Sequence, residues 1–116
     1  MTRPELFSEI IATYRKHGWQ LRRVLMSPQT RRGGTAASAE GMSFEGVPVK
    51  EAVVDALWFA RASHAGREAW ELRLVAETPY ALFETFEADE AEEQREEVRR
   101  EMEARLGEYA GGAPQD

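Results

Sequence analysis

The side chains that could carry out chemistry are few and far apart in this sequence. The chain has no cysteine, which excludes thiol catalysis, disulfides and thiolate metal sites. Its only histidines, His17 and His64, stand at unrelated positions, whereas a zinc site needs clustered nitrogen or sulfur ligands. We therefore expect neither a metal nor a cofactor.

Two short arrangements have the residue types of nucleophilic or acid–base catalysis. Ser63 precedes His64, but adjacent residues of a strand or turn point apart, and no third group orients this pair. Glu71 and Glu84 could face each other across a hairpin, where their repulsion would raise the pKa of one carboxyl group. We expect solvent and arginines such as Arg73 to separate these carboxylates. The sequence therefore predicts a non-enzymatic protein.

Arg31 and Arg32 are the candidates for contact with an anion. They begin the run Arg31-Arg32-Gly33-Gly34-Thr35, in which guanidinium and backbone N–H groups could surround an oxyanion. The run lacks the lysine and the spacing of a phosphate-binding P-loop. It lies in a segment rich in glycine and small residues, 28–46, whose composition is more typical of a flexible loop without a ligand.

Opposite charges are concentrated at the two ends of the chain, whose net charge is −6. Residues 1–34 carry seven basic and two acidic side chains, and residues 87–116 carry eleven acidic and four basic ones. One interpretation is two surfaces of opposite sign that attract each other within the fold or between subunits. We favour it, because a nucleic-acid footprint usually dominates the charge of its domain. The other is a basic surface for nucleic acid, formed by Arg15, Lys16, Arg22, Arg23, Arg31 and Arg32.

The composition is that of a globular domain. Hydrophobic residues make up 42% of the chain and charged residues 31%, and no apolar run approaches the ~18 residues of a membrane helix. Acidic residues interrupt the apolar part of the N-terminus, unlike a secretory signal, so we expect a cytoplasmic protein. The 13 arginines against two lysines fit a GC-rich bacterial genome and indicate no partner.

The stretch 56–86 is expected to form the centre of the fold, as a three-stranded antiparallel meander. Residues 53–62 are expected to form a strand, in which the run 56–61 is apolar on both faces, as is typical of a central strand. Residues 69–76 alternate between apolar and polar side chains, and residues 80–86 are rich in aromatic ones. Gly66 can adopt the positive φ that a turn between the first two strands requires.

A helix and a strand are expected before this meander. Residues 3–17 have the apolar spacing of an amphipathic helix that ends at Gly18. Residues 20–27 have the composition of a strand, and their uneven apolar pattern suits the edge of a sheet. The segment 28–46 is expected to be a loop, which is either mobile or contains a short strand around residues 42–47. Residues 48–55 fit either a short helix or the start of the next strand.

A highly charged helix is expected after the meander, over residues 87–109. Its apolar stripe is thin, so we expect its first half to project into solvent and its second half to pack on the sheet. We place it on the same sheet face as the first helix. The predicted fold class is α+β, with an N-terminal helix, a four-stranded antiparallel sheet and a C-terminal charged helix. Residues 1–109 form the single domain, and residues 110–116 a disordered tail.

The aromatic residues of the meander exceed what one sheet face and two helices need for a core. If both helices cover one face, the other stays apolar and open, as at an interface. The candidate interface residues are Phe59, Val75 and Phe83, with Trp58 and Trp70 beside them. The alternative is a simple core in which both faces are partly covered.

The leading functional hypothesis is a non-enzymatic protein–protein interaction or adaptor domain that forms a homodimer through this sheet face. The alternative is a domain that binds a small apolar ligand in a pocket between sheet and helices, gated by the loop 28–46. The sequence names no pathway, partner or ligand for either hypothesis.

Overall fold

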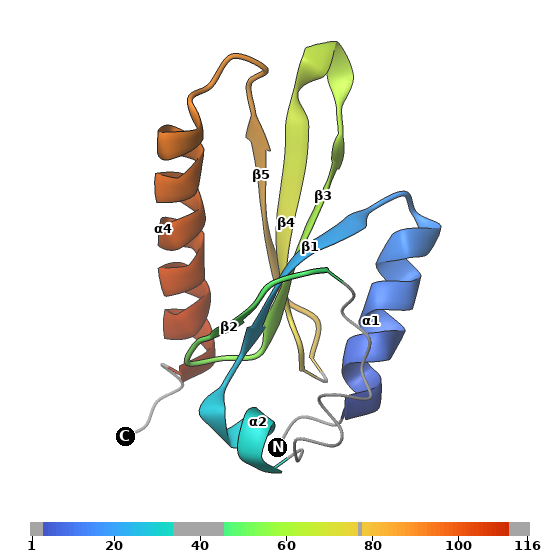
Figure 1. The fold of residues 1–116 in the computed structure, drawn as a ribbon, viewed down its shortest axis with the longest axis vertical. Helices are drawn as coiled ribbons and strands as arrows, with labels where there is room; N and C mark the ends of the chain where they lie inside the picture. Colours follow the sequence, from blue (N-terminus) through green and yellow to red (C-terminus); the bar gives the residue numbers. More distant parts are fainter. Residues whose placement is uncertain (1–3, 34–45, 77, 112–116) are drawn as a thin grey trace.

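One five-stranded sheet lies between two helices in the computed structural model of the chain (Figure 1). The structure describes residues 4–33, 46–76 and 78–111, and for residues 4, 31–33 and 111 it describes the backbone alone. In chain order the elements are α1 (Pro4–Lys16), β1 (Gln20–Met26), α2 (Pro28–Gly33), β2 (Val49–Glu51), β3 (Ala56–Ala62), the 3-10 turn η1 (His64–Gly66), β4 (Glu68–Leu74), β5 (Ala81–Phe86) and α4 (Glu92–Gly111).

The strands follow the order β2-β1-β3-β4-β5 across the sheet. The last three form the predicted antiparallel meander, and the α+β class is confirmed. The sheet has five strands instead of the four expected. The additional strand, β2, pairs parallel to β1, with Val49 opposite Val24. The segment 48–55 therefore differs from both alternatives, since it is a short strand followed by a turn into β3.

β1 lies in the interior of the sheet, so its predicted edge position is wrong. It pairs with β2 on one side and with β3 on the other. Val24, Leu25 and Met26 are all buried, because both faces of this strand are covered. The pairing with β3 is irregular between Leu21 and Arg23, where β1 contains an extra residue. This irregularity, and not an edge position, accounts for the uneven apolar pattern.

The segment after β1 begins with a short helix rather than the expected loop. The hydroxyl of Ser27 accepts a hydrogen bond from the N–H of Thr30 at 3.2 Å, as the N-cap residue of α2. Asp55 accepts the N–H of Ser27 at 2.8 Å and the hydroxyl of Thr30. This carboxylate is buried and joins the start of β3 to α2. Residues 34–45, most of the predicted loop, lie outside the described residues.

The two helices cover opposite faces of the sheet, so the shared face expected from the sequence is wrong (Figure 1). β3 shows the physical reason. Leu57 and Phe59 are buried on the α1 side, and Trp58 and Ala60 are buried on the α4 side. A strand that is apolar on both faces requires a cover on each of them.

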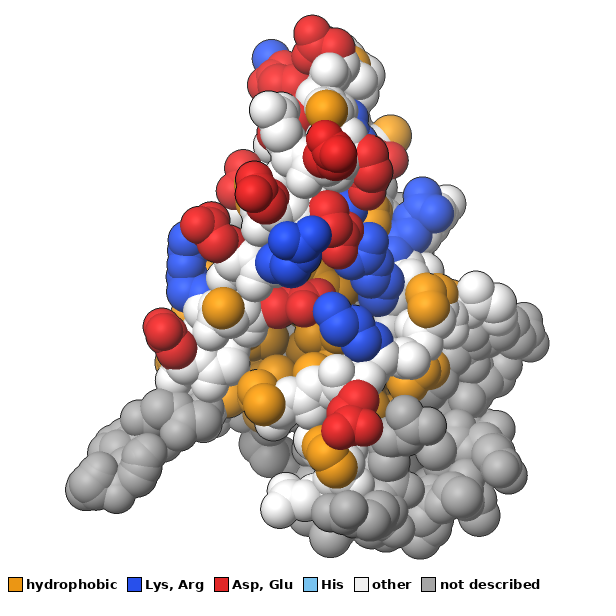
Figure 2. Space-filling view, turned by 60° about the vertical axis from the view of Figure 1, so that its left-hand side comes forward, with side chains coloured by type: hydrophobic (Ala, Val, Ile, Leu, Met, Phe, Trp, Pro, Cys, Tyr) orange, Lys and Arg blue, Asp and Glu red, His pale blue; other side chains and the backbone are white. Residues whose placement is uncertain are grey.

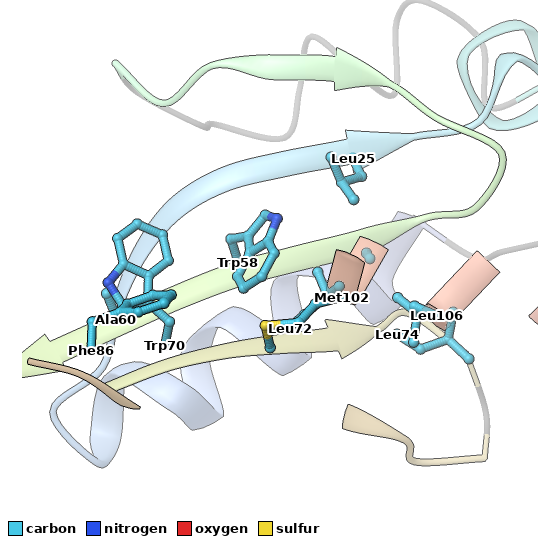
Figure 3. Close-up of a cluster of buried hydrophobic side chains, with 10 residues drawn as sticks. Leu25, Trp58, Ala60, Trp70, Leu72, Leu74, Phe86, Met102 and Leu106 are labelled. Atoms are coloured by element: carbon cyan, nitrogen blue, oxygen red, sulfur yellow. The ribbon is translucent and has the colours of Figure 1, made fainter. Parts of the chain in front are cut away.

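Each face has its own hydrophobic core. The α1 core consists of Phe7, Ile10, Ile11, Leu21, Val24, Met26, Leu57, Phe59 and Val75. The α4 core, shown in Figure 3, consists of Leu25, Ala56, Trp58, Ala60, Trp70, Leu72, Leu74, Phe86, Met102 and Leu106. The centre of the sheet is therefore closed on both sides by helices of the same chain.

Candidate functional site

Four of the five residues predicted at an open sheet face are divided between the two cores. Phe59 and Val75 are buried in the α1 core, and Trp58 and Trp70 are buried in the α4 core. Phe83 is the one member of the set with an exposed side chain, at 58%. Four of the five side chains are therefore covered, because each face carries its own helix. The candidate surface is reduced to the surroundings of Phe83.

Phe83 lies on the α1 side of the sheet but outside the α1 core. Its ring meets Trp19 edge-on, with centroids 6.4 Å apart and planes at 86°. Trp19 is half-buried, and the guanidinium group of Arg61 lies 4.7 Å from the centroid of its ring. On the same side of β5, Ala81 is exposed and Thr85 is half-buried. We call Ala81, Phe83, Thr85 and Trp19 the β5 margin.

β5 is an edge strand, and its outer backbone groups have no strand partner within the described sheet. The N–H of Leu74 donates to the carbonyl of Tyr80 at 2.9 Å, and the ladder between β4 and β5 continues in register from there. Along an antiparallel strand, the N–H and C=O groups of successive residues point alternately to one neighbouring strand and to the opposite side. The N–H and C=O groups of Ala81, Phe83 and Thr85 therefore point away from β4, toward the free edge.

β5 lacks most of the features that keep an edge strand from pairing. Its six residues, ALFETF, include no proline and no lysine. Its register with β4 contains no bulge. Its one charged side chain, Glu84, lies opposite Trp70 and so points to the α4 face. Because proteins commonly protect edges with lysine, proline or bulges, this edge is open to pairing.

Tyr14 connects α1 to the same side of the sheet. Its ring stacks on Phe59 with centroids 4.1 Å apart, and its hydroxyl donates a hydrogen bond to Glu71. Burial raises the pKa of Tyr14 well above its ordinary value; the hydrogen bond and charge of Glu71 add to the rise, and Arg73 opposes it. A phenol that stays protonated and donates to a carboxylate joins α1 to β4 and does not serve as a base.

An open groove of about 220 Å³ lies beside Tyr14. Ligand pockets are usually larger, roughly 300–1,000 Å³, and mostly apolar. This groove is open to solvent, and charged side chains line part of it. It would therefore shield an apolar ligand from water only in part. Most of the predicted gate, 28–46, lies outside the described residues. The lining residues are Leu6, Glu9, Ile10, Thr13, Tyr14 and Arg73.

A network of charged side chains joins α4 to the other face of the sheet. Arg99 is 2% exposed, and it forms ion pairs with Glu92 at 2.7 Å and Glu96 at 2.8 Å while its guanidinium group lies over Trp70. Arg23 of β1 donates two hydrogen bonds to Glu96, at 2.9 and 3.2 Å. The bonds from Arg23, with the one from Arg99, lower the pKa of Glu96 to about 2 against the opposing effect of burial.

This network brings the first half of α4 onto the sheet, contrary to the expectation that this half projects into solvent. Arg95 lies 5.7 Å from the centroid of the Phe86 ring and bonds to Glu68 at 3.2 Å. Arginine stems and planar guanidinium groups occupy places that apolar side chains usually fill. Figure 2 shows acidic side chains along α4 and basic ones between this helix and the sheet. The Arg23–Glu96 pair joins the basic and acidic parts of the chain within the fold.

No family model matches this chain, and no curated protein or solved structure matches it significantly. Its function is therefore inferred from its own geometry. The feature of the fold on which this inference rests is the free edge of β5.

The side chains with catalytic potential do not come together. Glu71 lies on the α1 face, where it binds Tyr14, whereas Glu84 lies on the α4 face, so these two carboxylates do not face each other across the hairpin. Ser63 and His64 are exposed at the turn between β3 and β4. These positions do not bring together a nucleophile, a base and a group that orients the base.

The structure describes both histidines but not the side chains of the candidate anion site. Within the described residues, no group of three or more histidine or acidic side chains could hold a metal ion. Arg31 and Arg32 belong to α2, and their side chains lie outside the described part of the chain, so their contact with an anion stays a prediction. None of the described helices is long and apolar enough to cross a membrane.

Sequence reasoning missed two buried charged residues, Arg99 and Asp55. A signal existed for Arg99, because its position completes a helical stripe with Arg95, Met102 and Leu106. Asp55, just before β3, binds Ser27, which lies 28 residues earlier. No local pattern marks a contact at this distance in the chain.

Proposed function

We propose that this chain is a non-enzymatic interaction domain that self-associates by antiparallel pairing of β5 with β5 of a second copy. The observation that carries the proposal is the outward direction of the backbone groups of Ala81, Phe83 and Thr85. A row of unpaired N–H and C=O groups is a template for another strand. Pairing of this kind extends the sheet of one copy into that of the other.

The sequence of β5 is compatible with pairing to itself. A two-fold axis at Phe83 places this residue opposite its counterpart, and it places Ala81 opposite Thr85 of the second copy. These three positions are the ones whose backbone groups point to the edge, so both strands meet in hydrogen-bonded register. Glu84 then lies opposite Leu82 of the second copy, and no two carboxylates face each other. This charge pattern favours a second copy as the occupant.

Side chains of the β5 margin add to the pairing. Directly opposed aromatic residues on neighbouring strands stabilise a sheet by about 0.2–1 kcal/mol relative to a pair of alanines. A pair of Phe83 rings therefore stabilises the proposed register. Each Phe83 already contacts Trp19 of its own copy. The aromatic rings of two copies thus form one continuous apolar strip on the α1 side, which removes the exposed ring of Phe83 from water.

Light scattering coupled to size-exclusion chromatography tests this proposal on the full chain. Thr85→Pro removes an outward N–H without removing a bond to β4, and Phe83→Lys places a charge on the edge. Val53→Lys is the matched control, because Val53 is 81% exposed and lies outside the β5 margin. We expect dimers of the wild type and of the control, and monomers of the other two variants with unchanged circular dichroism.

A wild-type chain that stays monomeric at high concentration would overturn self-association and leave the β5 edge to a different protein. Dimers that persist in both Thr85→Pro and Phe83→Lys would also overturn the proposal, since they would place the interface elsewhere. Hydrogen exchange provides an independent readout. The amides of Ala81, Phe83 and Thr85 should gain protection as the protein concentration rises.

A further inference from the structure

A hollow of about 490 Å³ lies where the β3–β4 hairpin extends past the start of β1. Figure 1 shows this hairpin standing beyond the turn that joins α1 to β1. The hollow is therefore bounded by the hairpin on one side and by that turn on the other. Its lining residues are Gly18, Gln20, Arg22, Arg61, Ala62, Gly66, Arg67 and Glu68.

Positive charge dominates the lining of this hollow. Arg61 is held in place by a hydrogen bond of 2.8 Å to the carbonyl of His17 and by the ring of Trp19 beneath it. Arg67 forms an ion pair with Glu87, in which its Nε lies 3.1 Å from a carboxylate oxygen. Arg22 is exposed and makes no hydrogen bond or ion pair within the described part of the chain. One guanidinium group is thus free, and two more are held beside it.

The one acidic residue of the lining is already engaged elsewhere. Glu68 accepts hydrogen bonds from the indole N–H of Trp70 at 2.9 Å and from Arg95 at 3.2 Å. These partners hold its carboxylate on the α4 side of the sheet. Glu68 is therefore a weak competitor for the arginines of the hollow, and an incoming anion meets a local excess of positive charge.

The backbone of Ala62 supplies a further donor. Ser63 donates its N–H to the carbonyl of Arg67 at 2.8 Å, so by alternation the N–H and C=O groups of Ala62 point toward β1. The strand β1 begins only at Gln20, which pairs with Ala60. Ala62 therefore extends past the end of its neighbour, and its N–H faces the hollow without a strand partner in the described sheet.

We propose that this hollow is a binding site for a small phosphate-bearing ligand. Guanidinium groups present paired donors that match the oxygens of a phosphate group, and a backbone N–H adds a directional bond. The volume lies in the range of small-molecule sites, roughly 300–1,000 Å³, and exceeds the space that one phosphate group needs. Recognition rests on Arg22, Arg61 and Arg67, whereas the pairing of β5 uses other residues, so either proposal can fail alone.

Isothermal titration of the full chain with inorganic pyrophosphate at low ionic strength tests this site. Removal of one charged donor with Arg22→Gln should weaken binding about tenfold, and added salt should weaken it further. Arg105→Gln is the control, because Arg105 is an exposed arginine of α4 outside the hollow. The amide resonance of Ala62 should shift during the titration, which a nonspecific attraction of anions to the surface would not produce selectively.

Several results would overturn the site. They are absence of binding by the wild type at millimolar pyrophosphate, equal affinity of Arg22→Gln and the wild type, and equal loss in Arg105→Gln. Binding of a single-stranded oligonucleotide without binding of pyrophosphate would also overturn it, because the ligand would then be a nucleic acid surface and not a small molecule.

Discussion

Arg99 of α4 lies over the ring of Trp70 of β4, with its guanidinium carbon 4.1 Å from the ring centroid. Only 2% of Arg99 is exposed, and its Nε has no hydrogen-bond partner. The helix is therefore joined to the sheet by a buried cation that combines an aromatic contact with two ion pairs. Buried ion pairs are sensitive to the loss of one partner but tolerate joint replacement by apolar groups.

Replacement of Arg99 should separate the effect of charge from the effect of packing. Arg99→Ala removes a partner of Glu96 and leaves a cavity, which should lower the free energy of unfolding by about 3 kcal/mol or more. Arg99→Met fills the space and removes the unpaired Nε, so its cost should stay below about 1.5 kcal/mol. Urea unfolding measures both. The exposed neighbour Arg100→Ala should change stability by no more than ~0.5 kcal/mol, and equal losses in all three variants would contradict this role.

Glu96 should make stability depend on pH under acidic conditions. Its pKa in the fold is about 2, lowered from the ordinary value of 4.5, so its contribution is present above about pH 4.5 and is lost as the pH falls toward 2. The free energy of unfolding, measured at successive pH values across this window, should fall less steeply in Glu96→Gln than in the wild type. Glu97→Gln, an exposed neighbour, is the control. Identical slopes in wild type and Glu96→Gln would refute the assignment.

Tyr14 should ionise late in a base titration. Its pKa is raised in the fold, so its contribution to stability is complete below the ordinary tyrosine value of 10 and is lost at higher pH. The difference in tyrosinate absorbance between the wild type and Tyr14→Phe should therefore appear only well above that value. Glu71→Gln should lower the pKa of Tyr14 in part, because burial, the largest cause, remains. A difference signal centred near pH 10 would contradict the buried hydrogen bond.

The two cores should respond independently to mutation. Ile10→Val in the α1 core should cost about 0.5–1.5 kcal/mol, and its effect should add to that of Leu106→Val within ~0.5 kcal/mol, because the sheet separates the sites. Leu74→Val is the comparison, since Leu74 and Leu106 belong to the same core. Urea unfolding of the single and double variants gives both coupling energies. A larger coupling between Ile10 and Leu106 than between Leu74 and Leu106 would be incompatible with separate cores.

Local patterns in the sequence predicted α1 and the meander, because each is determined by spacing within a few residues. The apolar repeat of residues 3–17 and the alternation of residues 69–76 both appear in the structure. The position of β1 was not predictable in this way, since it depends on β2, a strand of three residues paired across a long connection. A strand as short as β2 shows no recognisable alternation of apolar and polar side chains.

The candidate site was predictable in part. Phe83 was among the residues expected at an interface, and its exposure distinguishes it from Phe59. In the sequence, Phe59 and Phe83 are both aromatic residues of a predicted strand. Whether each side chain is buried depends on which sheet face each helix covers. On the α4 face, Arg95 and Arg99 contact Phe86 and Trp70 and complete the stripe that Met102 and Leu106 begin. The direction of the β5 backbone is a property of the strand order and cannot be read from side chains.

The position of α4 in the chain has a consequence for biosynthesis. All five strands precede this helix, so while a ribosome translates the chain, the sheet can assemble before residues 92–111 have emerged. During that interval Trp58, Leu72 and Leu74 are uncovered, and they form the floor that α4 later closes. At this stage of synthesis, the apolar sheet face that α4 later covers is exposed to solvent. The nascent protein should then depend most on chaperones.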